Sequence, residues 1–170
     1  MLEDNQTTAV HQSRAGRYAE VRRRIEVLLE GEDDWIAAMA TVACELHAAH
    51  DYFHWTGFYR AVSDDLLIVG PYQGGHGCLR IPFDRGVCGA AARSRQTQFV
   101  PDVNAFPGHI ACSSTTQSEV VVPVVTPQGR LLAVLDVDSD DPAAFDEVDQ
   151  AELESLCDWL GRTFAETQAL

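Results

Sequence analysis

Hydrophobic residues recur with the period of an α-helix through the first part of the chain. Between Arg17 and Glu30 they form one helical stripe, and Gly31 follows where that stripe ends. Asp33 and Asp34 are suited to the start of a second helix. The apolar face of this helix consists of Trp35, Met39, Val42 and Leu46. The pattern therefore predicts two consecutive amphipathic helices.

The middle of the chain alternates short apolar runs with turn residues, which is typical of β-strands. A small, alanine-rich stretch at Gly86–Ser94 predicts a short helix among them. Two later runs flank Pro127-Gln128-Gly129, and this arrangement is typical of a β-hairpin. The expected strands are Tyr52–Val62, Leu66–Gly70, Cys78–Phe83, Val120–Thr126 and Arg130–Val137.

The end of the chain returns to the helical period. Asp146 and Asp149 have the spacing of a capping arrangement. Helices outside and hairpin-linked strands inside predict an α+β domain with an antiparallel sheet. A chain of 170 residues has room for one domain, which we place at residues 15–170 behind a polar N-terminal tail, 1–14. The apolar stripe of the last helix is Leu153, Leu156, Cys157, Leu160 and Phe164.

The charge balance narrows the choice of partners. Twelve Lys and Arg residues against 26 Asp and Glu residues give a net charge of −14. Such a surface repels phosphate backbones and anionic membranes, so we expect no nucleic-acid partner and no membrane partner. A membrane span needs about 20 apolar residues, and no apolar run in the sequence approaches this length. The N-terminus lacks a signal-peptide core. A cytoplasmic location is expected.

The five cysteines fall into two groups. Their odd number, in a chain expected to be intracellular, argues against a structural disulfide set. Cys44 lies in an alanine-rich helix and Cys157 in an apolar stripe, and we assign neither of them any chemistry. Cys78, Cys88 and Cys112 follow glycine-rich or polar segments, where packing explains them poorly. Cys88 is expected at a helix N-terminus, where the helix dipole lowers the pKa of a thiol.

Three interpretations of the loop cysteines stay open on these residues alone: incidental thiols, a zinc site and thiol redox chemistry. A zinc site would combine Cys78, Cys88 and Cys112 with His109. Zinc ligands normally come in close pairs such as C-x₂-C, and this sequence has no such pair. Redox chemistry needs only one activated cysteine and one resolving cysteine within reach, whatever their spacing. It is the better fit.

Acidic residues stand where an apolar strand ends. Asp136 and Asp138 alternate along it, so the strand period places both on one face, beside Leu132 and Val134. Carboxyl groups on such a face gain raised pKa values or bind an ammonium group. The alternative is that the strand simply ends in solvent at Asp136. The hairpin would bring Glu119 near these two aspartates.

Two aromatic residues could form a pocket wall. Trp55 and Tyr59 are four positions apart, so an extended strand places them on the same face. Packing in the core is one interpretation. The other is a wall that accepts a cation or a methylated sulfur group, because aromatic faces attract both.

A series of short motifs follows in order between Asp51 and Ser139. They are Trp55-Thr-Gly-Phe-Tyr59, Gly70-Pro-Tyr-Gln-Gly74, Cys78-x-Arg-Ile-Pro82, Arg85-Gly-Val-Cys-Gly89, Asp102-Val103, Gly108-His-Ile-Ala-Cys112, Ser118-Glu119 and Leu135-Asp-Val-Asp-Ser139. The series resembles the GAF-domain free methionine-(R)-sulfoxide reductases. Ordinary GAF modules lack the three loop cysteines.

This resemblance implies a GAF-like fold with a six-stranded antiparallel sheet flanked by the N- and C-terminal helices, usually in a homodimer. It implies reduction of free L-methionine-(R)-sulfoxide, with Cys112 as the nucleophile and Cys78 as the resolving thiol. Cys88 would be secondary or contribute to recycling. Thioredoxin or a similar dithiol would restore the thiols, and neither a metal nor a bound cofactor is expected.

The resemblance also assigns the substrate contacts. Trp55 and Tyr59 would hold the methyl end, while Glu119, Asp136 and Asp138 would bind the free amino group and manage the sulfoxide proton. A GAF module that binds a small ligand or senses oxidants without turnover is the alternative function. The sequence departs from the family pattern at His54, Gly77 and Ser113, and in a longer turn at Thr126–Arg130.

Overall fold

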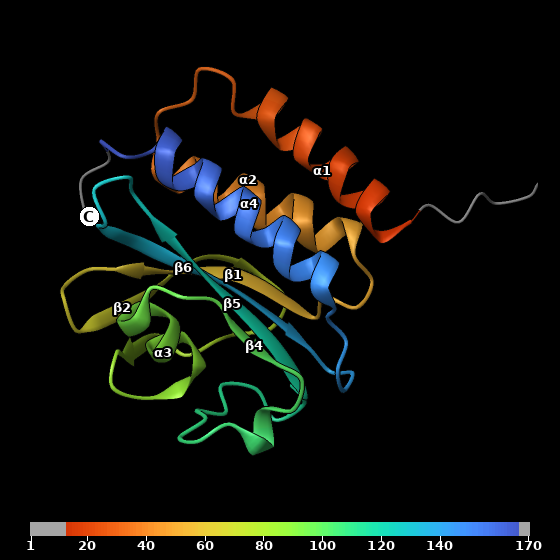
Figure 1. Cartoon of the computed structure of the whole chain (residues 1–170), viewed down its shortest axis with the longest axis vertical. Coiled ribbons are helices and arrows are strands. Elements are labelled where there is room, and N and C mark those ends of the chain that lie inside the picture. The colour runs from red at the N-terminus through yellow and green to blue at the C-terminus, as the bar shows by residue number, and fades with distance from the viewer. Residues whose placement is uncertain (1–12, 167–170) are drawn as a thin grey trace, which may run out of the picture.

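The computed structural model describes residues 13–166, in which six strands form one antiparallel sheet with helices on both faces (Figure 1). The strand order is β3-β2-β1-β6-β5-β4. The strands are β1 (Trp55–Ala61), β2 (Leu66–Gln73), β3 (Arg80–Pro82), β4 (Gln98–Val100), β5 (Ser118–Val125) and β6 (Leu131–Ser139). The helices are α1 (Arg14–Leu28), α2 (Trp35–Ala49), α3 (Gly86–Ser94), α4 (Glu147–Thr163) and a 3₁₀ turn at Val103–Ala105.

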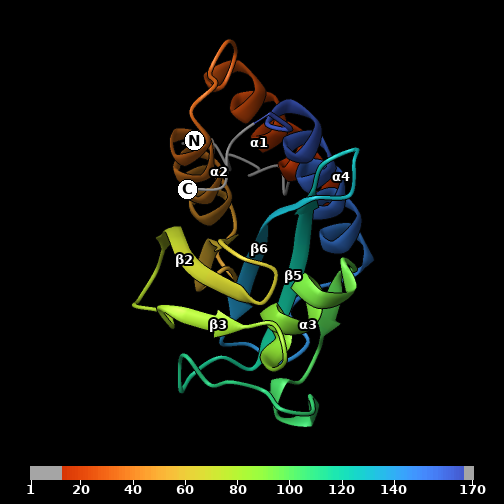
Figure 2. The same ribbon diagram turned by 90° about the vertical axis from the view of Figure 1, so that its left-hand side faces the viewer.

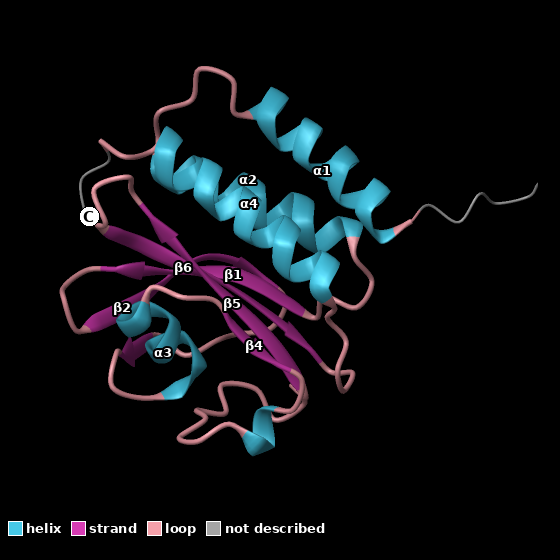
Figure 3. Cartoon of the chain, viewed as in Figure 1, coloured by secondary structure: helices cyan, strands magenta, loops and turns pink. Residues whose placement is uncertain are grey.

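The helices are divided unequally between the two faces of the sheet. Helices α2 and α4 pack directly on one face, and α1 packs on α2 and α4 (Figures 1 and 3). Helix α3 and the loop from β4 to β5 cover the opposite face (Figure 2). Each face carries its own buried apolar cluster. The expected α+β architecture, a six-stranded antiparallel sheet flanked by the N- and C-terminal helices, is confirmed. Within residues 13–166, none of the helices is long and apolar enough to cross a bilayer.

Local capping explains where the long helices begin. Helix α1 starts at Arg14, three residues before the expected Arg17, because the Ser13 hydroxyl accepts the Gly16 N–H at 3.1 Å. Helix α2 follows Asp34, whose side chain accepts the Ala37 N–H at 2.8 Å. The capping box expected before α4 is present. The predicted polar tail, 1–14, lies mostly outside the described residues.

Several details of the sheet differ from expectation. Strand β3 begins at Arg80, so Cys78, expected as the first residue of this strand, lies in the loop before it. Strand β4 was not predicted, because three residues are too short to show a period. Leu132 was expected beside Asp136 but belongs to the cluster under the helices. A bulge pairs Val124 with Ala133 and then Val125 with Leu131, which shifts the alternation at the start of β6. Further along β6, successive side chains again alternate regularly between the two faces of the sheet.

Candidate active site

The site lies on the sheet face opposite α2 and α4, where the ends of three neighbouring strands meet. On the central strand β6, Asp138 is paired with Trp55 of β1 on one side and with Glu119 of β5 on the other. Asp136 stands two positions earlier on the same face. The register alone therefore brings these side chains together, since directly paired residues have Cβ atoms about 4.5–5.5 Å apart.

A cavity lies over this corner of the sheet, roofed by α3 and by the loop from β4 to β5. Seven of the eight residues predicted for the site line it, and Cys78 is joined to it through Cys112. The seven are Trp55, Tyr59, Cys88, Cys112, Glu119, Asp136 and Asp138. Residues separated by more than 80 positions in the sequence thus share one chamber.

Cys78 and Cys112 form a disulfide. The two residues are 34 positions apart, and their Cα atoms lie 5.2 Å apart, within the range of about 4.4–6.8 Å that a disulfide requires. Both side chains are half-buried at the mouth of the cavity. The disulfide takes two sulfurs out of the zinc set considered above and supplies the pair that redox chemistry needs.

Cys88 differs from the expectation for it. It occupies the first turn of α3, as predicted, but its side chain is only 4% exposed and lies in the apolar cluster. Burial raises the pKa of the Cys88 thiol well above its usual value, and the nearby carboxyl groups of Asp136 and Glu119 raise it further. The prediction of a lowered pKa is therefore wrong, because it took no account of desolvation and of the carboxyl groups that face Cys88. Cys88 is a protonated thiol in this structure.

Three carboxyl groups face the cavity from β5 and β6. Glu119 and Asp136 are each 5% exposed, so the alternative in which the strand ends in solvent at Asp136 is excluded. Burial raises the pKa of Asp136 to about 7, although hydrogen bonds from Cys88 and Glu119 lower it. Burial and the charges of the two aspartates raise the pKa of Glu119 well above its usual value. Burial and the charge of Asp136 do the same for Asp138.

These pKa directions indicate different roles for the carboxyl groups of the cluster. At neutral pH Glu119 keeps its proton and donates it in a hydrogen bond to Asp136. Asp136 titrates close to neutrality, so it is the member of the pair that becomes charged first. The cluster therefore contains both a carboxylic acid that can donate a proton and a carboxylate that can hold a cation.

The aromatic residues form a stacked wall. The centroids of the Trp55 and Tyr59 rings lie 5.6 Å apart with 22° between the ring planes, and Tyr72 also stacks on Trp55, with a centroid distance of 5.3 Å. The Trp55 indole donates to the Gly75 carbonyl at 2.9 Å, which holds the ring in place. Trp55 and Tyr59 belong to the core and also line the cavity; that their faces accept a cation or a methylated sulfur group stays a prediction. Tyr72 was missed.

Gly77 explains how the Cys78 loop can lie against this wall. A Cβ atom at position 77 would stand 2.8 Å from the Tyr59 hydroxyl and 3.1 Å from the Trp55 ring. A methyl group there would push the loop or the rings apart. The departure from the family pattern at this position therefore belongs to the pocket itself.

The structure adds residues to the site that the sequence analysis did not assign. His109, considered before only as a zinc ligand, lines the cavity with its Nε2 atom 3.8 Å from Glu119 Oε2. Burial lowers the pKa of His109, so the ring is neutral. Ser113 also lines the cavity and contacts the Thr115 hydroxyl at 3.0 Å. Nothing in the spacing of these residues distinguished them from other polar loop positions.

His54 is a positioning residue and not part of the lining. Its backbone N–H donates to the Asp138 carbonyl at 2.9 Å, and its Nδ1 atom accepts the Asp140 N–H at 3.0 Å. These bonds fasten the end of β1 to the end of β6. They hold Asp138 at the edge of the cavity.

Replacing Asp136 by asparagine is expected to make stability less dependent on pH. The pKa of Asp136 is about 7 in the folded protein and about 4 in an unfolded chain. The folded state therefore binds an extra proton in this window, so stability falls as the pH rises from about 4 to about 7. At about 1.4 kcal/mol per pH unit, the variant should gain on the order of 2 kcal/mol relative to wild type between about pH 5 and pH 8.

Urea unfolding across this pH range measures the effect. The exposed Asp64, in the turn after β1, offers the control. The free energy of unfolding of Asp64→Asn should change with pH in the same way as that of wild type. If the free energy of unfolding of Asp136→Asn also changed with pH as that of wild type does, burial would not hold the Asp136 carboxyl group protonated.

The fold and this site place the chain among known proteins. The GAF domain profile matches residues 30–164, so the chain belongs to the GAF domain family. A free methionine-R-sulfoxide reductase of Saccharomyces cerevisiae is 40% identical over 144 residues, covering 81% of this chain and 80% of the yeast protein. That of Escherichia coli is 38% identical over 150 residues, covering 88% and 90%.

A solved structure shows the same similarity. The free methionine-R-sulfoxide reductase from Neisseria meningitidis, in complex with its substrate, is 44% identical to this chain. It superimposes with a TM-score of 0.84, covering 90% of this chain and 91% of that one.

Proposed function

We propose that this protein reduces free L-methionine-(R)-sulfoxide to methionine. The observation that carries the proposal is a redox-capable sulfur pair at the mouth of a cavity that has an aromatic wall and buried carboxyl groups. The relatives named above support the choice of substrate. A sensor module that only binds a ligand would not require the Cys78–Cys112 pair, and turnover separates the reductase from a module that senses oxidants through this pair.

The lining suggests how the substrate binds. The Trp55 and Tyr59 faces accept the S-methyl group, because methylated sulfur packs well against aromatic rings. Asp136 and Asp138 receive the ammonium group, which offsets the repulsion between their charges. A methionine sulfoxide within a peptide has no ammonium group at that position. The carboxyl cluster therefore selects the free amino acid.

The first chemical step is oxygen transfer at Cys112. Its thiolate attacks the sulfoxide sulfur while Glu119, the protonated acid, donates a proton to the oxygen. In the intermediate that results, the bond between the two sulfurs and the sulfur–oxygen bond of the substrate both break, while the protonated oxygen forms a new bond to the Cys112 sulfur. Methionine leaves, and Cys112 is left as a sulfenic acid. Methionine has gained two electrons and Cys112 has lost them. Glu119 regains its proton from solvent after methionine has left.

The second step forms the disulfide. The Cys78 thiol displaces water from the Cys112 sulfenic acid and makes the bond found in the structure. A dithiol reductant, for which thioredoxin is the candidate, then exchanges thiols with this disulfide and releases both cysteines. The homodimer and the cytoplasmic location expected from the sequence stay predictions.

An assay of substrate selectivity tests the function. NADPH consumption is followed with thioredoxin reductase and thioredoxin, using free L-methionine-(R)-sulfoxide, the (S) epimer and a peptide sulfoxide. Turnover of the first substrate alone is expected. Turnover of the peptide would contradict the ammonium subsite, and silence on all three would favour the sensor.

Replacing Cys78 by serine is expected to leave one turnover per protein and to block the next. Cys112 can still be oxidised to the sulfenic acid, but no thiol at position 78 can resolve it. Methionine released in a single turnover and in steady state is measured by chromatography. Cys44→Ser serves as the control, because Cys44 is an exposed free thiol on α2. Undiminished steady-state turnover with thioredoxin would exclude Cys78 as the resolving residue.

A further inference from the structure

One group of potential metal ligands lies inside the cavity, separate from the disulfide. The Cys88 sulfur, a Glu119 carboxylate oxygen and an Asp136 carboxylate oxygen all lie within 4.8 Å of one another. They come from α3, β5 and β6, so rigid elements hold them. Four-coordinate zinc, with bonds of about 2.3 Å to sulfur and 2.0–2.2 Å to oxygen, separates its ligand atoms by about 3.4–3.6 Å. Small side-chain rotations would close the remaining gap.

A second observation points to a ligand at this place. Asp136 is 5% exposed and lines the cavity, yet its Oδ1 atom accepts no hydrogen bond from any described residue. A buried carboxylate oxygen without a partner is costly. Among the described residues that line the cavity there is no Lys or Arg, and the His109 ring beside Glu119 is neutral. A bound cation would supply what the oxygen lacks.

We propose that Cys88, Glu119 and Asp136 form a binding site for Zn²⁺, with the His109 Nε2 atom or a water molecule as the fourth ligand. One thiolate and two carboxylates suit zinc, which accepts sulfur and oxygen donors together. Binding displaces the protons that Cys88 and Glu119 hold, so it releases protons and strengthens as the pH rises. The site excludes Cys78 and Cys112 and is therefore present in the disulfide form.

The location of the site gives it a consequence for the proposed reaction. Glu119 and Asp136 are the groups assigned above to the sulfoxide proton and the ammonium group. Zn²⁺ and the substrate would then exclude each other, and the metal would act as a competitive inhibitor. This consequence rests on the proposed function, whereas the metal site itself does not.

Cobalt and zinc binding to the disulfide form test the site. Co²⁺ gives a thiolate-to-metal charge-transfer absorption only when a cysteine sulfur is a ligand. We expect this absorption in wild type at one metal per chain and its loss on addition of Zn²⁺. It should be absent in Cys88→Ser, and calorimetry should show Zn²⁺ binding at least about tenfold weaker in Asp136→Asn. Absorption retained in Cys88→Ser would overturn the proposal.

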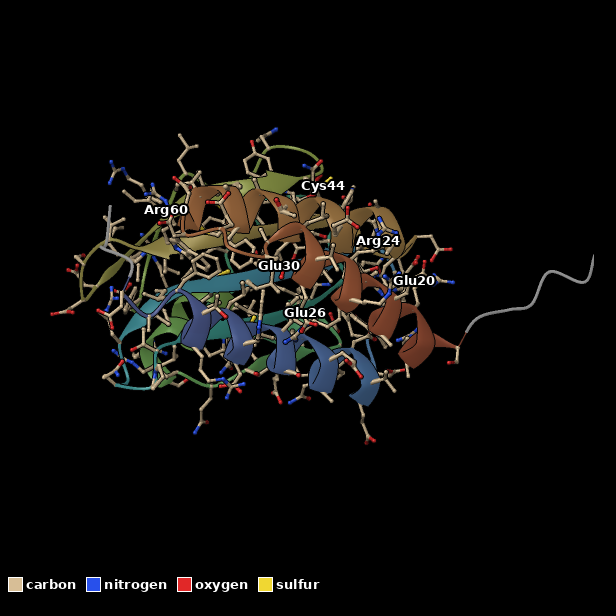
Figure 4. All side chains as sticks on the ribbon, turned by 90° about the horizontal axis from the view of Figure 1, so that it is seen from above. Glu20, Arg24, Glu26, Glu30, Cys44 and Arg60 are labelled. Carbon is tan, nitrogen blue, oxygen red and sulfur yellow. A yellow bond between two sulfur atoms is a disulfide. The ribbon has the colours of Figure 1, made fainter. Side chains whose placement is uncertain are left out.

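Cys44→Ser is the matched control, because Cys44 is a free thiol at the outer surface of α2 (Figure 4). This variant should bind both metals as wild type does. If it lost the charge-transfer absorption, the metal would be at Cys44 and the proposal would fail. X-ray absorption of the zinc-loaded wild type gives an answer without variants. One sulfur and two or three oxygen or nitrogen ligands are expected, and a sulfur-free shell would contradict the site.

Activity measurements separate this inference from the proposed function. Reductase activity with no zinc binding would remove the metal site and leave the function intact. Zinc binding in a protein without reductase activity would remove the proposed function and leave the metal site intact.

Discussion

Replacement of Cys112 by serine should lower the turnover of free methionine-(R)-sulfoxide by at least about 10³-fold. The hydroxyl group cannot take up the sulfoxide oxygen as a sulfenic acid, and no other thiol can stand in for Cys112. Cys88 is buried and kept protonated, while Cys78 is placed to attack Cys112 rather than the substrate. The loss should appear in kcat and also in the single-turnover yield.

The cysteine inventory provides the control for this variant. Disulfide-bonded wild type has three free cysteines, Cys44, Cys88 and Cys157. Removing Cys112 frees Cys78, so thiol titration after denaturation should count four. Such a count, with an unchanged unfolding midpoint under reducing conditions, would show that the variant is folded and merely unable to form the disulfide. Activity within tenfold of wild type would exclude Cys112 as the nucleophile.

Substitution of Glu119 by glutamine should lower kcat by about 10²–10⁴-fold, the usual worth of general acid catalysis. The amide keeps the size of the protonated acid and can still donate a hydrogen bond to Asp136. It has no proton to give to the sulfoxide oxygen. KM should therefore change much less than kcat.

Asp136→Asn should have the opposite balance of effects on kcat and KM from that of Glu119→Gln. It removes the carboxylate assigned to the ammonium group and leaves the acid in place, so KM should rise more than kcat falls. Because the pKa of Asp136 is about 7, kcat/KM in wild type should increase with pH through neutrality as this group ionises. Asp136→Asn should lose that rise. Equal effects of the two variants on kcat and KM would show that the roles of Glu119 and Asp136 are not divided in this way.

Much of the fold was accessible from local patterns. The periods of α1, α2 and α4 and the hairpin of β5 and β6 come from side chains that must face a core, and these preferences act within a few residues. The capping residues Asp34 and Asp146 likewise act on their own helices. Strand β4 shows where such patterns stop, because three residues carry too little information.

Only part of the site could be predicted from local patterns in the sequence. The face shared by Asp136 and Asp138 follows from the strand period, so it could be stated in advance. The Cys78–Cys112 pair was implied by the motif series and not by spacing. Closing it requires two loops, 34 residues apart, to meet over the same edge of the sheet. His109 lies beside Glu119 only because the loop from β4 to β5 folds over the sheet, and Tyr72 stacks on Trp55 only because β2 pairs with β1.

The acidity of the site groups depended entirely on the three-dimensional surroundings. The position of Cys88 in the first turn of α3 was readable from the chain, but the direction of its pKa shift was not. Desolvation and neighbouring charges set that direction, and the charges belong to carboxyl groups on β5 and β6 rather than to its own helix. Local order along this chain thus dictates which residues can take part in chemistry. The packing of distant segments dictates their protonation, because the electric field at a buried group is summed over every element around it.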